Sequence, residues 1–476
     1  MKALFFLASV VLLTGLLFCG QSYAQSRGKV TNKNDPEYIS LGIYYFDAWS
    51  AQSGNDWAGS GKTDPWYYWG AIDMRTRFSD REPWLGWYDQ AEPGIVEQQV
   101  AWMIDYGIDF IVFEFFYNSK NDDDKDKKIC PTTGLSKYLE SPRRNEIEFA
   151  IFWGDEPSLF PEDKTAWDRI VNYWLDNFLL EPEYKRIDGK PVIFIWKDLP
   201  EKAREIGFDS WTAMFDSAKE LARGRGLDDL YFVVCIHRDT MNYDYEVAKA
   251  TGFDALTAYN WPLNPDYQAI MDFYKGPQGW QFMLNMPRVA NGQMPFFLPL
   301  LSGFDNRPWG GSAASFSTPD QFEEHLIDGR NRILANPAQT MRTAIICAWN
   351  EHGEGSVVEP TKKYGFEYLN RIRKVFRLMK NKVKAFDDVK YYPNPIQPSK
   401  GLNYTKMNFL NMPAGTRIKI YTLLGQVVRD LEADANGTAV WDGKNNAGAK
   451  AASGVYIVYM EDGNRNKKRI KVAVER

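Results

Sequence analysis

Residues 343–360 read TAIICAWNEHGEGSVVEP. The apolar first part, residues 343–349, predicts a strand that is buried on both faces, as in a parallel sheet. Two glutamates, Glu351 and Glu354, follow this strand, and glycines between and after them allow tight turns of the backbone. In a barrel of parallel strands, the side chains available for chemistry lie just past the carboxyl ends of the strands. The stretch therefore predicts a strand and a candidate site together.

Seven further apolar runs precede this one, and amphipathic helical stretches separate them. Alternation of short strands with helices indicates repeated βα units and a parallel sheet. Eight strands are the number that closes a TIM barrel. The fold class predicted for residues 38–385 is therefore mixed α/β, a (β/α)8 TIM barrel. Its expected strands are residues 40–46, 110–115, 147–153, 192–196, 231–236, 255–259, 296–301 and 343–349.

Two of the expected helices carry start and stop signals. Pro93 opens a helix whose apolar residues fall on one face, and Gly107 can supply the left-handed residue that ends it. Thr318 and Gln321 form a capping-box pattern ahead of another helix, which leads into the last strand.

The composition changes after the last expected barrel helix. Residues 389–395 read VKYYPNP, and two prolines within three residues make a stiff connector. Short alternating strands follow at residues 417–421, 438–441 and 454–459, with Gly and Asn turns between them. We expect residues 386–476 to form a small all-β, immunoglobulin-like sandwich.

This tail resembles the type IX secretion system sorting domain. Four family patterns occur in order: a YPNP opening, an I-K-I-Y-x-x-x-G-Q-x-V strand pair, a W-D-G turn and an S-G-x-Y-x-x strand. They stand at residues 392–395, 418–427, 441–443 and 453–459. The resemblance implies the type IX secretion machinery as a partner and export through the periplasm, to the medium or the cell surface, with or without removal of the tail. A generic immunoglobulin-like module that binds sugar or packs on the barrel is the alternative.

The first residues have the layout of a cleavable signal peptide. Lys2 precedes an apolar stretch and a small-x-small run that ends at Ala24. We expect residues 1–24 to be removed and residues 25–37 to form a linker. Lipidation of Cys19 is the alternative, which the bulky residue before it disfavours. No later run is long enough to span a bilayer.

The charge balance and the cysteines exclude several classes of protein. Lys+Arg 57 against Asp+Glu 62 leaves a net charge of -5, so we expect no nucleic-acid partner. Two of the three cysteines that remain after cleavage lie in expected strands, which indicates neither a disulfide framework nor a metal site. The 17 Trp among many aromatic residues suit sugars, because pyranose faces stack on rings.

Glu351 and Glu354 are the candidate catalytic pair. Glycosidic cleavage needs one carboxylic acid and one carboxylate near the anomeric carbon, and two neighbouring carboxyls can hold these different protonation states. By spacing alone, a Glu-x-x-Glu pair is more often a solvated pair on a surface helix. The position directly after a buried strand favours the catalytic interpretation.

The barrel part resembles glycoside hydrolase family 99 and the related WbsX-like proteins. Their last-strand motif, Asn-Glu-Trp-x-Glu-Gly followed by Glu-Pro, is similar to residues 349–360, although His352 stands where those families carry Trp. The resemblance covers residues 38–380 and implies a (β/α)8 barrel with no cofactor. Further similar stretches are GIYYF at 42–46 followed by Trp49, GIDFIVFE at 107–114, DGKPV at 188–192, and Tyr364-Gly365.

Family 99 enzymes are retaining endo-α-mannosidases, and the resemblance implies their chemistry here. Glu351 would deprotonate the 2-hydroxyl of the sugar, which attacks the anomeric carbon to give a 1,2-anhydro sugar. Glu354 would protonate the leaving oxygen and then activate water. This chemistry requires a 2-hydroxyl trans to the leaving group, as in α-mannosides or α-rhamnosides.

Other residues near strand ends are candidates for binding an oligosaccharide or polysaccharide. Tyr45, Trp153, Tyr259 and Trp309 offer ring faces for stacking, or else pack as rim residues. His352 either contacts a sugar hydroxyl, tunes Glu354, or is structural. The polar and aromatic candidates at the remaining positions are Trp49, Asp155, Asn260 and Asn350.

Three charged residues complete the set of candidates. Asp305 and Arg307 either grip hydroxyls in a neighbouring subsite or form a local ion pair. Glu114 either orients the catalytic groups or pairs with an arginine of a neighbouring strand. Glu359 is expected to serve the structure of its loop.

Two other functions remain open at the level of the sequence. WbsX-like proteins have been described as glycosyltransferases. A transferase that uses nucleotide sugars needs a cytoplasmic supply of its donor, and it usually has a Gly-rich loop that binds phosphate. The sequence contains no such loop. The second alternative is a barrel that binds a glycan without cleaving it. Retention of both glutamates disfavours this alternative.

Overall fold

The computed structural model describes most of the chain after residue 34. The described residues are 35–51, 64–68, 72–117, 130, 132–154, 159–196, 200–236, 252–259, 266–311, 314–377, 386, 389–401, 404–434, 437–463 and 465–476. The chain divides into two compact units, Thr31–Leu378 and one that includes Met379–Arg476. None of the helices in the described ranges has the length and hydropathy that crossing a bilayer requires.

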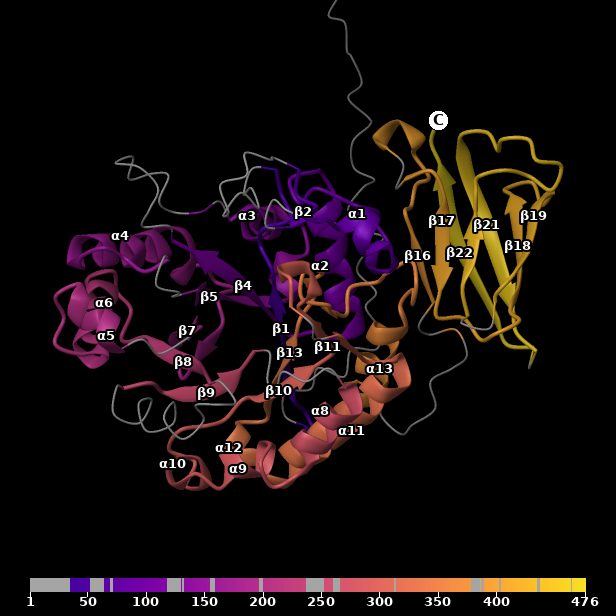
Figure 1. Cartoon of the computed structure of the whole chain (residues 1–476). Coiled ribbons are helices and arrows are strands. Elements are labelled where there is room, and N and C mark those ends of the chain that lie inside the picture. The colour runs from indigo at the N-terminus through magenta and orange to yellow at the C-terminus, as the bar shows by residue number, and fades with distance from the viewer. Residues whose placement is uncertain are drawn as a thin grey trace, which may run out of the picture. The chain divides into compact units, whose positions relative to one another are not determined.

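The first unit is a nearly closed barrel of eight parallel strands, whose labels follow one another around a ring in Figure 1. Strand β1 pairs with β13 on one side and with β4 on the other, with Ser40 opposite Thr343 and Gly42 opposite Phe110. The ends of the sheet meet where the amide of Phe297 donates to the carbonyl of Leu256 at 2.8 Å. The barrel strands are β1 (Ser40–Tyr45), β4 (Phe110–Phe116), β5 (Glu148–Gly154), β7 (Lys190–Ile195), β8 (Tyr231–Ile236), β9 (Ala255–Ala258), β10 (Leu298–Leu301) and β13 (Thr343–Cys347).

Eight parallel strands confirm the fold class predicted from the sequence, and each expected strand overlaps an observed one. Successive side chains of a strand point to opposite faces, and large aromatic side chains of several strands meet inside the barrel. The ring of Tyr44 on β1 lies 5.0 Å from that of Phe152 on β5 and 6.3 Å from that of Phe194 on β7.

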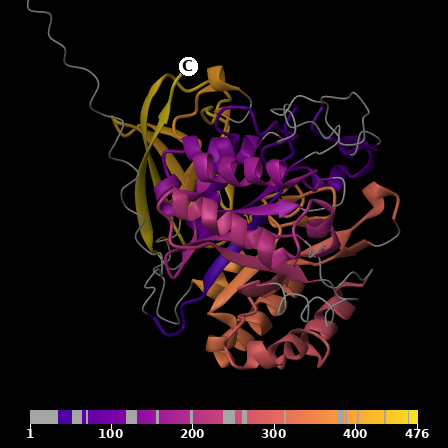
Figure 2. The same cartoon turned by 90° about the vertical axis from the view of Figure 1, so that its left-hand side faces the viewer.

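Helices cover the outside of the barrel. Helices α4 and α6 lie side by side over β5 and β7 (Figures 1 and 2). The helices are α1 (Met74–Arg77), α2 (Ile95–Tyr106), α3 (Thr133–Glu140), α4 (Lys164–Trp174), α5 (Pro200–Glu205), α6 (Trp211–Gly224), α8 (Tyr267–Lys275), α9 (Trp280–Leu284), α10 (Pro287–Ala290), α11 (Pro319–Ala335), α12 (Pro337–Thr340) and α13 (Glu367–Phe376).

The expected helix signals are confirmed. Gly107 follows α2 with φ of 91°, the left-handed conformation that a residue without Cβ adopts at low cost. Thr318 and Gln321 form the complete capping box at the start of α11, each side chain accepting from the other's backbone amide.

The barrel unit also contains short antiparallel strands. They are too short to be predicted from periodicity, and two of them form the hairpin that carries Glu351. They are β2 (Tyr67–Tyr68), β3 (Ile72–Asp73), β6 (Arg186–Ile187), β11 (Gly303–Asp305), β12 (Ala314–Phe316), β14 (Asn350–Glu351) and β15 (Ser356–Val357).

The second unit consists of two antiparallel sheets. One has the order β16-β17-β20 and the other β19-β18-β21-β22. Side chains from both sheets, among them Phe409, Ile418, Trp441 and Val458, share one buried core, as in a sandwich. The strands are β16 (Lys390–Tyr392), β17 (Met407–Leu410), β18 (Arg417–Thr422), β19 (Val427–Glu432), β20 (Ala439–Trp441), β21 (Gly454–Glu461) and β22 (Lys467–Val474).

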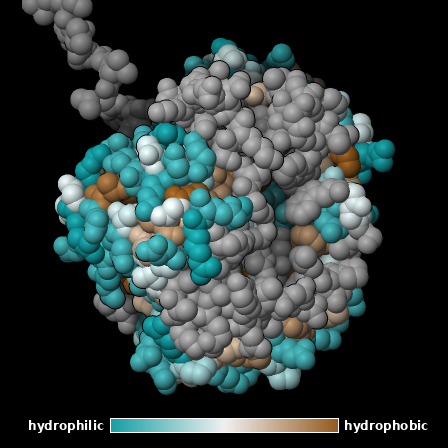
Figure 3. Space-filling model, turned by 60° about the vertical axis from the view of Figure 1, so that its left-hand side comes forward, coloured by the Kyte–Doolittle hydropathy of each residue, from teal (hydrophilic) through white to brown (hydrophobic). Residues whose placement is uncertain are grey.

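The face drawn in Figure 3 carries mostly hydrophilic side chains over the part that the structure describes. Hydrophobic residues appear there only as small, scattered patches, which is ordinary for the surface of a folded domain.

Candidate active site

The two candidate catalytic glutamates lie on one hairpin at the carboxyl end of β13. Asn350 and Glu351 of β14 pair with Val357 and Ser356 of β15. A turn of four residues joins the two strands, and the amide of Glu354 donates to the carbonyl of Glu351 at 3.1 Å. The backbone therefore holds both glutamates at the ends of a single tight turn.

The turn is closely packed on its neighbours. Gly355 has φ of 70°, and a Cβ added there would lie 3.0 Å from the Cβ of Asp305. The amide of Asp305 donates to the carbonyl of Glu354 at 2.5 Å. A glycine is therefore needed at position 355 for both conformation and space.

Three buried carboxyl groups converge at this end of the barrel. Glu351, Glu354 and Glu114 are 3%, 6% and 7% exposed. Burial, then the charge of Glu354, then that of Glu114 raises the pKa of Glu351 well above its usual range. Burial also raises the pKa of Glu114, while a hydrogen bond from Tyr259 acts in the opposite direction. Strong coupling of this kind is typical of acid–base sites.

Tyr259, just past the end of β9, connects two of these carboxyls. Its hydroxyl lies 2.7 Å from Oε1 of Glu114 and 3.1 Å from Oε1 of Glu351. Its ring packs 4.8 Å from Tyr44 and 4.9 Å from Trp196, and only 3% of the residue is exposed. Tyr259 was expected to be a stacking platform; the structure makes it part of the inner wall, with its hydroxyl on the carboxyls.

Asn350 and Trp49 hold the hairpin instead of facing a ligand. The amide side chain of Asn350 accepts from the N–H of Phe46 at 2.9 Å and donates to its carbonyl at 3.1 Å. The indole of Trp49 donates to the carbonyl of Asn350 at 2.7 Å, and both residues are fully buried. The expected sugar contacts of these two residues are replaced by contacts to the backbone.

His352 is fully buried behind the hairpin. Its Nε2 lies 3.0 Å from Oε2 of Glu359, which also accepts from the hydroxyl of Tyr88 at 2.9 Å. Gln99 donates to the other oxygen of Glu359 at 2.8 Å. This is the arrangement of a structural histidine, and Glu359 supports its loop as expected.

Asp305 and Arg307 form the local ion pair that was the alternative to sugar binding. Nε of Arg307 lies 2.9 Å from Oδ1 of Asp305, whose other oxygen also pairs with Arg81. Arg81 donates in addition to the carbonyl of His352. The fully buried Asp305 thus anchors an arginine that holds the turn between Glu351 and Glu354.

Tyr45 and Trp153 lie on the outer side of the barrel sheet and not in its mouth. The hydroxyl of Tyr45 donates to Gln99 on α2 at 2.6 Å. The ring of Trp153 lies 5.2 Å from Trp167 of α4 and 6.2 Å from Trp211 of α6. Neither ring is exposed at all, so these two are core residues; of the two alternatives predicted for them, stacking on sugar and packing, the structure shows packing.

Three other candidates cannot be placed at the site. Asp155 and Asn260 lie outside the described residues, and so does the side chain of Trp309 in the short turn Arg307–Trp309.

Buried polar residues that support the site carried no prediction from the sequence. Gln99 and Arg81 are the clearest cases, since Gln99 is a buried polar residue that donates to Glu359 and Arg81 is a buried charged residue that donates to the carbonyl of His352. A polar residue within the apolar face of helix α2 was the available signal for Gln99. No comparable pattern marked Arg81.

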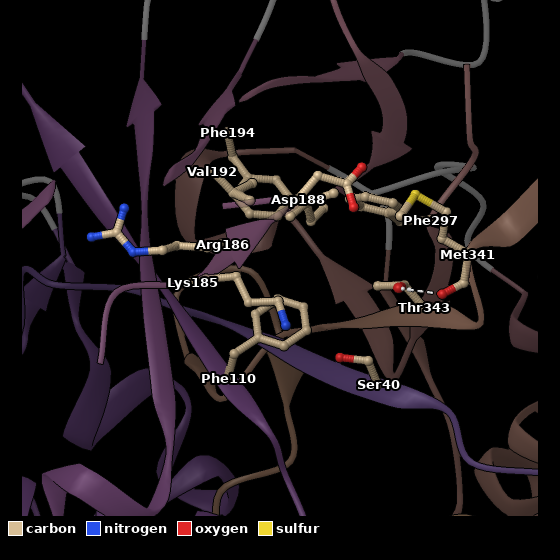
Figure 4. A pocket seen from close by; sticks show the side chains of 11 residues that line it. Ser40, Phe110, Lys185, Arg186, Asp188, Val192, Phe194, Phe297, Met341 and Thr343 are labelled. Carbon is tan, nitrogen blue, oxygen red and sulfur yellow. Dashed lines mark hydrogen bonds between the residues drawn. The ribbon is translucent and has the colours of Figure 1, made fainter. Parts of the chain in front are cut away.

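A pocket of about 220 Å³ lies at the opposite, amino end of the strands (Figure 4). Lys185, one of its lining residues, is already paired with Glu148 at 2.8 Å. In a TIM barrel this end contributes to stability and the carboxyl end to catalysis. The pocket is therefore separate from the glutamates. Its lining includes Ser40, Phe110, Lys185, Asp188, Phe297 and Thr343.

Comparison with known proteins agrees with the barrel. A family model described as glycosyltransferase WbsX matches residues 44–372. The uncharacterized protein WxcX of Xanthomonas campestris pv. campestris is 20% identical over 358 residues, which are 69% of this chain and 47% of that protein. The chain thus spans about half the length of the curated relatives it matches.

Two solved structures resemble the barrel. A glycoside hydrolase-like protein aligns with a TM-score of 0.50 and 15% identity over 72% of this chain and 95% of its own. The GH99 endo-alpha-mannosidase from Bacteroides thetaiotaomicron aligns with a TM-score of 0.47 and 16% identity over 71% of this chain and 95% of its own. At such identities the likeness concerns the fold alone. Because the family model covers most of the barrel, the chain belongs to the WbsX family.

Proposed function

We propose that the protein is a secreted retaining glycoside hydrolase that cleaves α-mannoside-type or α-rhamnoside-type linkages within a complex glycan. One observation carries the proposal: Glu351 and Glu354 stand at the two ends of one turn at the carboxyl end of a barrel strand, both buried. The charge of Glu354 raises the pKa of Glu351, so the two groups are close enough to hold different protonation states.

The reaction uses one glutamate as base and the other as acid. Glu351, as a carboxylate, takes the proton of the sugar 2-hydroxyl while that oxygen forms a bond to the anomeric carbon. The bond from that carbon to the leaving oxygen breaks, and Glu354 gives this oxygen its proton. Glu354, now a carboxylate, takes a proton from water, which attacks the anomeric carbon and opens the 1,2-anhydro sugar with net retention. Glu351 returns its proton to the 2-oxygen as the bond from that oxygen to the anomeric carbon breaks.

This geometry sets the class of substrate. The 2-hydroxyl must lie trans to the leaving group, which α-mannosides and α-rhamnosides satisfy.

The test incubates the protein with α-mannan, rhamnose-containing polysaccharides and N-glycans. We expect Glu351→Gln and Glu354→Gln to lose about 10²–10⁴-fold in rate, as loss of a general acid or base does. Glu97→Gln, on the exposed side of α2, is the matched control and should keep the wild-type rate. Proton NMR of the first product should show retained anomeric configuration. An unchanged rate in either active-site variant removes that residue from the mechanism.

A glycosyltransferase is the second candidate, because the matching family carries that description. It predicts release of a nucleoside diphosphate from a nucleotide sugar in the presence of an acceptor glycan. Hydrolysis of a glycan in the absence of a nucleotide sugar supports the hydrolase. Tight binding of a glycan without any product indicates a barrel that binds the glycan without cleaving it.

The secreted location rests on the two ends of the chain. Residues 1–24 have the layout of a signal peptide, and residues 386–476 resemble a type IX sorting domain. In cells with a type IX system, a reporter that carries both segments should reach the medium or the cell surface. A reporter that carries residues 1–24 alone should stay in the periplasm, and equal export of both would contradict the sorting role.

A further inference from the structure

The Tyr259 hydroxyl contacts one more carboxylate than its single hydrogen can serve. It lies 2.7 Å from Oε1 of Glu114 and 3.1 Å from Oε1 of Glu351. A phenol has one O–H to donate, and an ionised carboxyl can only accept. Both contacts become proper hydrogen bonds when one of the two carboxyls is protonated and donates to the tyrosine oxygen.

The surroundings also favour a proton here. Within the described residues, the charged groups that act on Glu114 are Glu354 and Asp47, and those that act on Glu351 are Glu354 and Glu114. All of them are acidic, and none offsets a buried negative charge. Two ionised carboxyls on one hydroxyl would therefore repel each other in a site with little water.

The position of the two carboxyls assigns the proton. Glu351 accepts from Tyr259 through Oε1, and its buried Oε2 has no hydrogen-bond partner within the described part of the chain. A base needs such an unoccupied acceptor for the proton that it removes. Glu114 lies on β4, which is separated from β13 by β1 alone, and reaches Glu351 through the tyrosine.

We propose that Glu114 stays a neutral carboxylic acid in the working enzyme and acts through Tyr259 as a positioning residue, which keeps Glu351 ionised. This inference rests on the proposed hydrolase mechanism. Glu114 donates to the Tyr259 oxygen, and Tyr259 donates to Glu351. With Glu354 protonated as the general acid, the three carboxyls carry a single negative charge, located on the base.

The kinetic test compares Glu114→Gln with Glu351→Gln. Glutamine keeps the size of glutamate and offers an N–H donor, so at position 114 it imitates the protonated acid. We expect the loss of kcat/KM to be smaller in Glu114→Gln than in Glu351→Gln, which loses about 10²–10⁴-fold, and the acid limb of the pH profile to stay at the wild-type pH in Glu114→Gln. Comparable losses in both variants overturn the proposal. So does an acid limb that moves to lower pH in Glu114→Gln, because it shows that position 114 carried a charge.

An infrared measurement needs no substrate. Near neutral pH, the difference spectrum between the wild type and Glu114→Gln should contain the C=O stretch of a protonated carboxyl. The difference spectrum with Glu351→Gln should contain carboxylate bands, and the reverse assignment overturns the proposal. If the wild type cleaves no glycan, the proposed function fails, while the infrared spectra still decide which carboxyl holds the proton.

Tyr259→Phe provides a second variant should Glu114→Gln not fold. The hydrogen bond from Tyr259 lowers the pKa of Glu351, so its loss should move the acid limb of kcat/KM to higher pH. The phenylalanine ring retains the packing on Tyr44 and Trp196. If the acid limb of kcat/KM stays at the wild-type pH in this variant, Glu114 does not act on Glu351 through Tyr259.

Discussion

At the scale of single residues, Asp47 at the end of β1 shows how burial and hydrogen bonds compete. Burial raises its pKa to about 7, while the amides of Leu135 and Gly134 favour the ionised form. These amides donate to its two oxygens at 2.9 and 2.5 Å, at the start of α3. The folded state thus holds a proton that the unfolded chain releases near pH 4.

The proton on Asp47 makes the stability of the fold depend on pH. Because the folded pKa is raised, the stability from this proton is present below about pH 4 and is lost as the pH rises towards 7. Asp47→Asn does not titrate, so its stability does not fall in this way. Between about pH 4 and pH 7, the free energy of unfolding of Asp47→Asn should therefore rise relative to that of the wild type. Urea unfolding of both proteins at several pH values measures the difference. A difference that does not vary with pH contradicts the prediction.

His352 lends itself to a stability measurement. His352→Phe deprives Glu359 of one buried partner, and we expect the free energy of unfolding to fall by about 1–3 kcal/mol. His352→Gln, which can still donate to Glu359, should lose less. Equal losses in the two variants would assign the effect to ring packing against Trp49 and Trp66.

The residue scale is also where prediction from sequence was weakest. Two tyrosines follow each other on β1, and the pleat sends their side chains to opposite faces. Tyr44 points into the barrel towards Tyr259, while Tyr45, the one predicted to bind sugar, points outwards to Gln99. A strand buried on both faces gives no alternation from which to choose between them. The Tyr259 bridge between Glu114 and Glu351 depends on three strands far apart in sequence, which no local pattern indicates.

At the scale of helices and strands, Trp153 of β5 joins the sheet to the helices that cover it. Its ring packs on Trp167, Trp174 and Trp211. Trp153→Ala should lower the free energy of unfolding by about 3–5 kcal/mol, because the cavity cannot close fully. Trp153→Phe should cost less. A stacking platform would behave differently, with a raised KM and unchanged stability, and kinetics beside urea unfolding separate the two.

Elements were predicted well where the sequence repeats a strong pattern. The eight barrel strands were predicted from apolar runs, and the helices from signals such as Gly107 and Thr318. The structure confirms both sets of elements. The hairpin of β14 and β15 was not predicted, since two-residue strands have no periodicity. The same reason applies to β16, whose three residues lie in the connector.

At the scale of the whole molecule, Arg377 determines how far the chain can be shortened from its carboxyl end before the barrel loses stability. It follows α13, pairs with Asp109, and donates to the carbonyls of Gly107 at 2.8 Å and Ile39 at 3.1 Å. A chain that ends at Leu378 should keep the fold of the barrel. A chain that ends at Phe376 should be about 3–5 kcal/mol less stable, because Asp109 loses its buried partner.

Thermal unfolding of the two shortened chains checks this prediction. Equal midpoints would show that Arg377 contributes nothing. Loss of folding in both would show that the barrel unit depends on residues beyond Leu378.

The Arg377 clamp has a mechanical consequence. It ties the beginning of the first barrel strand to the end of the last barrel helix, on the side away from Glu351 and Glu354. If the tail tethers the protein to a surface, a pulling force enters the barrel through this arginine and meets Ile39 and Asp109 first. Such a load would meet these contacts at the amino end of the strands before it reached the turn between Glu351 and Glu354.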